Sequence, residues 1–364
     1  MERPRCDFSL SFAGKHEIIG RGMGNRIDEI IMTRDNLEQL RREAQAHLEA
    51  KRWQEASRAF SSLLQDDGED EDALIGLALA LDRLGDYEQM YETAQRAAQL
   101  YPGSARALAC KARALQKLER LSEATVANDQ ALLLDTHLAL AWLNRSGQQL
   151  LQQRFPEALR ASERAIELDP SDTRAWANKG LALFNLNRLF EALQAIEESL
   201  KRDPDYLIAL EVKGEILRRF GRLKDVVVTM RHALDIAPDG VSALNLMAHA
   251  LRILSEYEAL RPITERLVLL EPDSLFAWEG HMAALRGLGH FEEACEAIDR
   301  VLELDPTNVR FWTIKADNLY RLGRYREAVS AAERALNIDE EYAPGRRIHE
   351  KAMRSMYQHK GKKK

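Results

Sequence analysis

The chain has 364 residues, of which 45% are apolar and 30% are charged, and its formal net charge is −6. This composition excludes wholesale disorder. The acidic total also argues against non-specific nucleic-acid binding by the whole surface, which requires a basic footprint.

Residues 1–36 differ from the rest of the chain. Residues 8–12 alternate like a short strand, and residues 20–24 carry three glycines without the Gly-Lys-Ser/Thr of a phosphate-binding loop. We expect residues 1–36 to be a non-repeat N-terminal leader that is partly disordered.

From residue 37 onward, one position recurs every 34 residues and is most often proline. A fixed period of this length indicates an array of small stacked units, each too small to bury its own apolar faces. The position is occupied in turn by Gly68, Pro102, Thr136, Pro170, Pro204, Pro238, Pro272, Pro306 and Glu340.

Each unit has the pattern of two short helices. In the unit that begins at Thr173, the residues Trp176, Gly180 and Leu183 share one helical face. A second helical pattern follows and ends at Pro204, which cannot continue a helix. We therefore expect a helix–turn–helix in every unit.

Several other positions keep the same register. A bulky residue begins each second helix, at Trp53, Tyr87, Leu121, Phe155, Leu189, Leu223, Tyr257, Phe291 and Tyr325. A small residue recurs in the first helices, at Ala44, Ala78, Ala112, Ser146, Gly180, Gly214, Ala248 and Ala316, with Met282 as the exception. Glycine marks several turns between the helices, where a left-handed conformation is often needed, at Gly85, Gly221, Gly289 and Gly323. Helix caps are predicted directly after prolines, at Ser171, Asp239, Asp273 and Thr307.

These in-phase positions, with Trp142, Trp176, Trp278 and Trp312 opening first helices, resemble the tetratricopeptide repeat family. The resemblance covers nine tandem units over residues 37–342. It implies an all-α, right-handed α-solenoid in which the first helix of each pair lines a concave groove. Members of the family bind peptides or protein surfaces there and are rarely enzymes.

The array has irregular units and a distinct end. Three β-branched residues begin at Val226, and Pro262 falls inside a predicted helix, so we expect a kink or an altered stacking angle near residues 255–265. Residues 343–358 have one apolar face and are expected to form a solvating C-terminal cap helix. Residues 359–364 are expected to be a basic disordered tail.

Candidate ligand residues lie on the side of the first helices that faces away from the stacking surface. Asn144 and Asn178 are one period apart and resemble the asparagine ladder with which some family members hold a peptide backbone; coincidence or a role in helix packing is the alternative. Basic residues nearby favour an acidic segment or a C-terminal carboxylate, although several also lie near helix C-termini, where the helix dipole favours them. The predicted groove residues are Arg113, Lys117, Asn144, Arg174, Asn178, Leu181, Phe184 and Arg218.

No catalytic motif, metal-ligand spacing or membrane-spanning run is found in the sequence, so we expect no enzyme activity, no cofactor and no metal. Cys6, Cys110 and Cys295 indicate reduced thiols in a cytoplasmic protein. The predicted function is a scaffold or adaptor that binds a protein or peptide segment in the groove. A regulatory or sensor subunit of an associated enzyme is the alternative, and an RNA-binding array is a weaker one. The sequence leaves the partner and the oligomeric state open.

Overall fold

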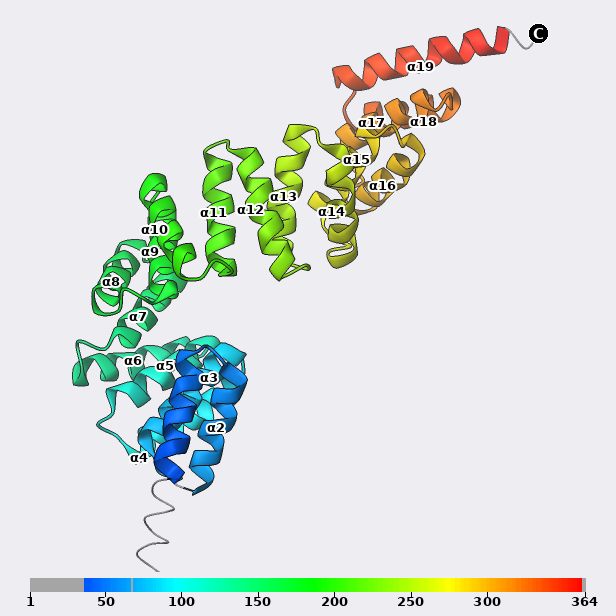
Figure 1. Ribbon diagram of the computed structural model, residues 1–364. Helices are drawn as coiled ribbons and strands as arrows, with labels where there is room; N and C mark the ends of the chain where they lie inside the picture. The colour runs from blue at the N-terminus through cyan, green and yellow to red at the C-terminus, as the bar shows by residue number, and fades with distance from the viewer. Residues whose placement is uncertain (1–35, 67, 362–364) are drawn as a thin grey trace, which may run out of the picture. The chain divides into compact units, whose positions relative to one another are not determined.

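The chain is an all-α repeat solenoid in which short helices alternate with tight turns (Figure 1). The structure is a computed structural model that describes residues 36–66 and 68–361. The strand-like segment at residues 8–12, most of the expected leader and residues 362–364 of the expected tail lie outside the described residues. The predicted all-α fold class is confirmed.

The helices alternate between a first and a second type within each 34-residue unit. The first helices are residues 36–49, α3 (Glu71–Leu84), α5 (Ala105–Lys117), α7 (Ala139–Leu151), α9 (Thr173–Asn185), α11 (Leu207–Arg219), α13 (Val241–Leu254), α15 (Leu275–Gly287) and α17 (Val309–Arg321). The second helices are α2 (Trp53–Asp66), α4 (Tyr87–Leu100), α6 (Leu121–Leu134), α8 (Phe155–Leu168), α10 (Leu189–Arg202), α12 (Leu223–Ile236), α14 (Tyr257–Leu270), α16 (Phe291–Leu304) and α18 (Tyr325–Ile338). The last helix is α19 (Ala343–Gly361).

The chain divides into two compact units, the first ending at Pro170 and the second beginning at Ser171. Within each unit, each helix packs against the next one along the chain. First helices also pack against one another: α3 contacts α5 and α5 contacts α7 in the first unit, while α9, α11, α13 and α15 follow one another in the second. A surface made of first helices therefore runs through each unit.

The columns of bulky and small residues explain how the two helices of a pair meet. All nine bulky residues predicted to begin second helices are the first residues of those helices. The small positions are buried, and the helices approach closely there: a Cβ on Gly180 would lie 2.6 Å from Ile196 Cδ1, and one on Gly214 would lie 2.5 Å from Met230 Cε. Small residues are thus required where a second-helix side chain covers the first helix.

One left-handed residue turns the chain between the two helices of every described pair. The four predicted glycines have positive φ, between 70° and 81°. The other units place a non-glycine residue at the same position with φ between 57° and 61°: Lys51, Glu119, Gln153, Asn187 and Ser255. The amide that follows bonds back to the preceding helix, as Arg188 N does to Leu183 O at 2.9 Å. This is the hydrogen-bond pattern of a Schellman helix end.

The predicted helix caps are wrong by one residue. Asp172 and Ser274 cap α9 and α15 with side-chain oxygens, and Gly240 and Asn308 precede α13 and α17 without a side-chain cap bond. The reason is a β-turn around the proline, closed by bonds such as Ser274 N to Glu271 O at 3.1 Å. Proline occupies the second of the four positions of this turn, and the residue that caps the next helix occupies the fourth. The cap therefore lies two residues after the proline.

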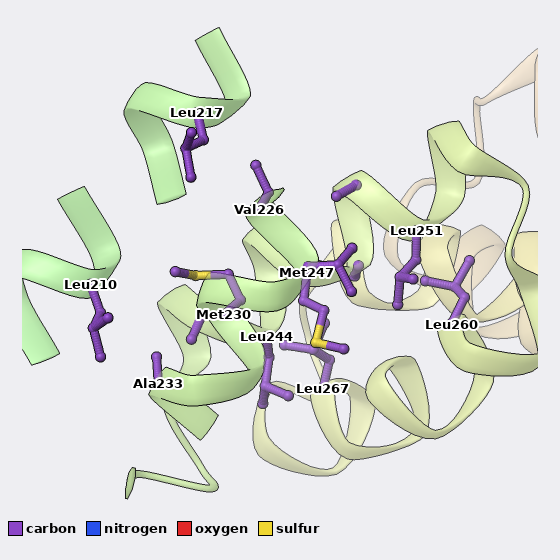
Figure 2. Close-up of a cluster of buried hydrophobic side chains, with 14 of the residues drawn as sticks. Leu210, Leu217, Val226, Met230, Ala233, Leu244, Met247, Leu251, Leu260 and Leu267 are labelled. Carbon is purple, nitrogen blue, oxygen red and sulfur yellow. The ribbon is translucent and has the colours of Figure 1, made fainter. Parts of the chain in front are cut away.

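The core of the second unit is continuous through its irregular region (Figure 2). Met230 from α12, Leu244 and Met247 from α13, and Leu260 and Leu267 from α14 are buried in one cluster. Pro262 does not break α14, which runs from Tyr257 to Leu270 as a single helix. The boundary between the two compact units falls after Pro170, outside the 255–265 region.

The left-handed residue between the two helices of each pair gives a prediction about stability. Gln153→Gly removes the Cβ that is strained at φ 57° and should raise the free energy of unfolding by about 1 kcal/mol, less the extra entropy of glycine in the unfolded chain. Urea unfolding followed by circular dichroism measures the change. The control is Gln152→Gly, because Gln152 has φ −82° and glycine there should be destabilising. Equal losses of stability in both variants would contradict the strain argument.

Candidate functional site

The first helices of the second unit carry side chains in register along one surface, which we call the first-helix face. It is the surface formed where α9, α11, α13, α15, α17 and α19 lie one after another. The side chains that these helices place along this surface belong to the face. Arg218 on α11, Arg252 on α13 and Arg286 on α15 are each one period apart. The face therefore presents three guanidinium groups at equivalent positions of three neighbouring helices.

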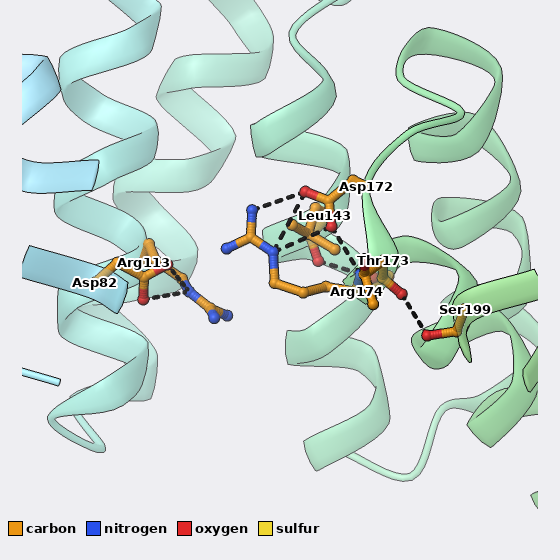
Figure 3. A network of polar contacts seen from close by, with 8 residues as sticks. Asp82, Arg113, Leu143, Asp172, Thr173, Arg174 and Ser199 are labelled. Atoms are coloured by element: carbon orange, nitrogen blue, oxygen red, sulfur yellow. Dashed lines mark hydrogen bonds and ion pairs between the residues drawn. The ribbon is translucent and has the colours of Figure 1, made fainter. Parts of the chain in front are cut away.

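Polar contacts across neighbouring first helices join residues 31 positions apart. In the first unit, Arg113 Nε on α5 donates to Asp82 Oδ1 on α3 at 3.2 Å (Figure 3). In the second unit, Arg286 Nη2 on α15 lies 2.9 Å from Asp317 Oδ2 on α17. The recurrence of this spacing shows that the helix register places the same pair of positions opposite each other in both units.

The predicted groove residues of the first unit have structural partners. The Arg113–Asp82 pair is largely buried, with side-chain exposures of 16% and 4%. Lys117 lies over the ring of Tyr87, with its Nζ 5.4 Å from the centroid. These contacts join neighbouring helices, so both residues support the packing of the first unit.

Asn144 corrects the expectation of exposed groove asparagines. It is fully buried, and its Nδ2 donates to the backbone oxygen of Ala109 in the preceding first helix at 2.9 Å. Asn178, one period later, is half-buried. Leu143, directly before Asn144 on α7, is also buried. The exposure prediction fails because first helices pack side by side, and that contact covers part of the side that was expected to be open.

The predicted groove residues of the second unit lie on α9 and α11. The guanidinium of Arg174 pairs with the α9 cap, its Nη2 lying 2.7 Å from Asp172 Oδ2 (Figure 3). Leu181 and Phe184 are half-buried. The guanidinium of Arg219, on α11, lies 4.5 Å from the centroid of the Phe184 ring. A guanidinium group is thus held at each end of α9, from Arg174 of α9 itself at the start and from Arg219 of α11 at the end.

Charged neighbours on α11 and α13 surround the arginine column, the set of Arg218, Arg252 and Arg286. Arg218 makes two hydrogen bonds to Glu215, at 2.8 and 2.6 Å, and these lower the pKa of the Glu215 carboxyl. Desolvation lowers the pKa of His249, and the charges of Arg218 and Arg252 lower it further, so this imidazole is held neutral beside them. Burial raises the pKa of Glu211, at the start of α11. Arg252 forms no ion pair with any residue that the structure describes.

A cavity of about 330 Å³ lies between α15, α17 and α19 at the C-terminal end of the face. Ile314, Pro344 and Ile348 give it an apolar lining, and Arg286, Arg347 and Lys351 give it three cations. Thr313 supplies a hydroxyl and Asp317 supplies one carboxylate.

Sequence reasoning missed the α19 part of this cavity because α19 was interpreted as a solvating cap. The signal was available in the spacing. Ala343 begins α19 one period after Val309 begins α17, and Arg347, Ile348 and Lys351 follow Thr313, Ile314 and Asp317 by 34 residues. Helix α19 therefore takes the place of a further first helix.

A second cavity, of about 500 Å³, lies in the first unit between α4, α5 and α6. It is lined mainly by apolar and amide side chains, with Leu133 on α6 84% exposed at its edge. Among the described residues, no group of three or more His, Cys, Asp or Glu side chains is placed to hold a metal ion. No helix in the described part of the chain combines the length and apolar character needed to cross a membrane.

Stacked helical hairpins with a 34-residue period define an α-helical repeat protein. A model of the tetratricopeptide repeat family matches residues 149–206 and 283–344. A model of the anaphase-promoting complex, or cyclosome, subunit 3 matches residues 49–131. No curated protein matches the chain. The chain is a tetratricopeptide repeat protein.

The chain is also similar to several solved structures. Pseudomonas aeruginosa pilF is 22% identical, with a TM-score of 0.50, and the match covers 57% of this chain and 95% of that one. YrrB, described as a TPR protein with an unusual peptide-binding site, is 24% identical with a TM-score of 0.36, over 52% of this chain and 97% of its own. A point mutant of MamA is 20% identical with a TM-score of 0.42, over 46% of this chain and 97% of its own.

The Asp82–Arg113 pair gives a prediction about stability. Arg113→Met removes the guanidinium that pairs with the buried Asp82 carboxylate and should cost about 3 kcal/mol of unfolding free energy. Adding Asp82→Asn removes that charge and should recover much of the loss. Urea unfolding of both single variants and the double variant measures the coupling. Additive losses would show that the pair does not join α3 to α5 energetically.

Proposed function

We propose that this protein is a scaffold that binds an extended, acidic segment of a partner protein along the first-helix face of residues 171–364. The tetratricopeptide repeat fold supports protein–protein interaction in general. The proposal adds that the bound segment is acidic and extended.

The observation that carries the proposal is the column of Arg218, Arg252 and Arg286. Successive guanidinium groups lie on neighbouring packed helices, so they repeat at a constant interval along the face. An extended peptide also repeats its side chains at a constant interval. Guanidinium groups recognise carboxylates by paired hydrogen bonds, which favours acidic side chains on such a peptide.

The way the arginines are held adds to this argument. Glu215 fixes Arg218 and Asp317 fixes Arg286, which reduces the entropy lost when a ligand orders these side chains. Arg252, between them in the column, is exposed and is left with its hydrogen-bonding capacity for a partner. A ligand carboxylate at Arg252 would also lie beside the neutral His249.

The proposal retains the predicted residues of α9 as one end of the binding face. Asn178, Leu181 and Phe184 are half-buried there, and they offer an amide and apolar surface to a peptide backbone and side chain. Arg174 adds a cation at the start of the helix. Arg113, Lys117 and Asn144, in the other compact unit, are assigned to packing instead.

A charge reversal at Arg252 tests the proposal. The probe is a fluorescein-labelled peptide of Ser and Glu with one central Leu, of roughly 12 residues, which spans about 40 Å when extended. Anisotropy titration of the unmodified protein should show binding that weakens with added salt. Arg252→Glu should weaken binding about fivefold or more, because attraction becomes repulsion.

The matched control is Arg231→Glu, which makes the same charge change at an exposed position of the second helix α12. It should leave the affinity within about twofold, because its charge is screened from the opposite side of the helix layer. Equal effects of the two variants would mean that net charge, and not the first-helix face, governs binding. Failure of the unmodified protein to bind the peptide would overturn the proposal.

A further inference from the structure

The cavity between α15, α17 and α19 is an open depression of the first-helix face that combines an apolar lining with an excess of cations. Ile348 is buried at its base, and Ile314 and Pro344 complete the apolar part. Arg286, Arg347 and Lys351 surround it against the single carboxylate of Asp317.

The pairing of these charges leaves two cations available to a ligand. Asp317 Oδ2 already accepts from Arg286 Nη2 at 2.9 Å and from Arg321 Nε at 3.0 Å. Arg347 and Lys351 form no ion pair with any residue that the structure describes, and both are exposed. The Lys351 ammonium lies over the Tyr320 ring, 4.3 Å from its centroid, which keeps it at the edge of the cavity.

The helix that carries these cations adds to the positive potential. Pro344 lines the cavity from the first turn of α19, so the N-terminal end of a long helix points toward this region. Amide groups of a helix N-terminus favour an anion, although the effect is modest at an exposed site. The apolar base and the two exposed cations, which form no ion pair with a described residue, remain the stronger determinants.

The charge along the first-helix face also changes toward this cavity. At equivalent positions, α11 carries Glu211 and Glu215, whereas α19 carries Arg347 and Lys351. Glu211 and Glu215 therefore offset part of the positive charge that Arg218 gives to α11. An acidic segment should be attracted more strongly at α19 than at α11.

We propose that this cavity is an anchor site for an acidic protein segment, holding one aliphatic side chain against Ile314 and Ile348 while a neighbouring carboxylate pairs with Arg347 and Lys351. The inference rests on the proposed function and adds to it the place and chemistry of the anchor. Its size fits such a ligand, because about 330 Å³ accommodates one large side chain with room for its neighbour. Helix α19 then forms a wall of a binding site in addition to packing against α17 and α18.

The test compares two double variants with the Ser/Glu peptide that carries one central Leu. Arg347→Glu with Lys351→Glu reverses the cations of the cavity, and Arg326→Glu with Arg334→Glu makes the same charge change on the exposed side of the second helix α18. The cavity variant should weaken binding at least about tenfold, and the α18 variant less than about threefold. Circular dichroism and urea unfolding establish that both remain folded.

Two altered peptides separate the apolar and charged parts of the anchor. Replacing the central Leu by Ser should weaken binding to the unmodified protein about tenfold, because an apolar side chain is lost from a pocket. Replacing the Glu residues beside it by Lys should abolish binding to the unmodified protein and restore it in the cavity variant.

The outcomes distinguish this inference from the proposed function. If Arg252→Glu weakens binding and the cavity variant does not, the anchor is overturned and the arginine column stands. If neither change matters, both proposals fail. Binding that is indifferent to the central Leu overturns the apolar part of the anchor, and equal binding of a Gln peptide without Glu overturns the charged part.

Discussion

The left-handed residue between the two helices of each pair is the constraint on which the structure depends. It reverses the chain within one or two residues, so the bulky residue that begins the second helix falls directly after the turn, as Leu189 follows Asn187 and Arg188. The second helix then lies antiparallel to the first, and Ile196 reaches the small position at Gly180. A longer or looser turn would move this contact out of register. The constraint is strong enough that Lys51, Glu119 and Gln153 adopt the conformation without being glycine.

A fixed turn at each end of the unit makes the spacing between first helices constant. Proline turns close the other end, and their carbonyl oxygens are bonded from the next helix, as Pro272 and Pro306 accept from the indoles of Trp278 and Trp312 at 2.7 and 2.9 Å. Constant spacing is what places Arg113 opposite Asp82 and Arg286 opposite Asp317. It also places Arg218, Arg252 and Arg286 in one column. The repeated backbone therefore converts a sequence interval into a regular array of charges.

Features set within one repeat could be predicted from the sequence, whereas features set between repeats could not. The starts of the second helices and the turn glycines depend on local sterics, and they were predicted correctly. The caps were missed by one residue because the proline turn uses an extra position. Asn144 was misplaced because its burial depends on contact with Ala109, 35 residues away. The partners of Arg113 and Arg286 were missed for the same reason. The 34-residue period shows which residues occupy equivalent positions in successive repeats. It does not show that residues 31 positions apart lie opposite each other on neighbouring first helices.

Helix α19 combines the apolar pattern of a first helix with exposed cations. In the interior, a first helix is followed by a second helix and by another first helix, so its apolar positions are covered. Helix α19 occupies a first-helix position, and Ile348 packs toward the preceding repeat as Ile314 does one period earlier. Arg347 and Lys351 are exposed on α19, so these charged side chains keep their hydration. The cavity therefore combines an apolar base that the repeat pattern supplies with two exposed cations that form no ion pair with any described residue.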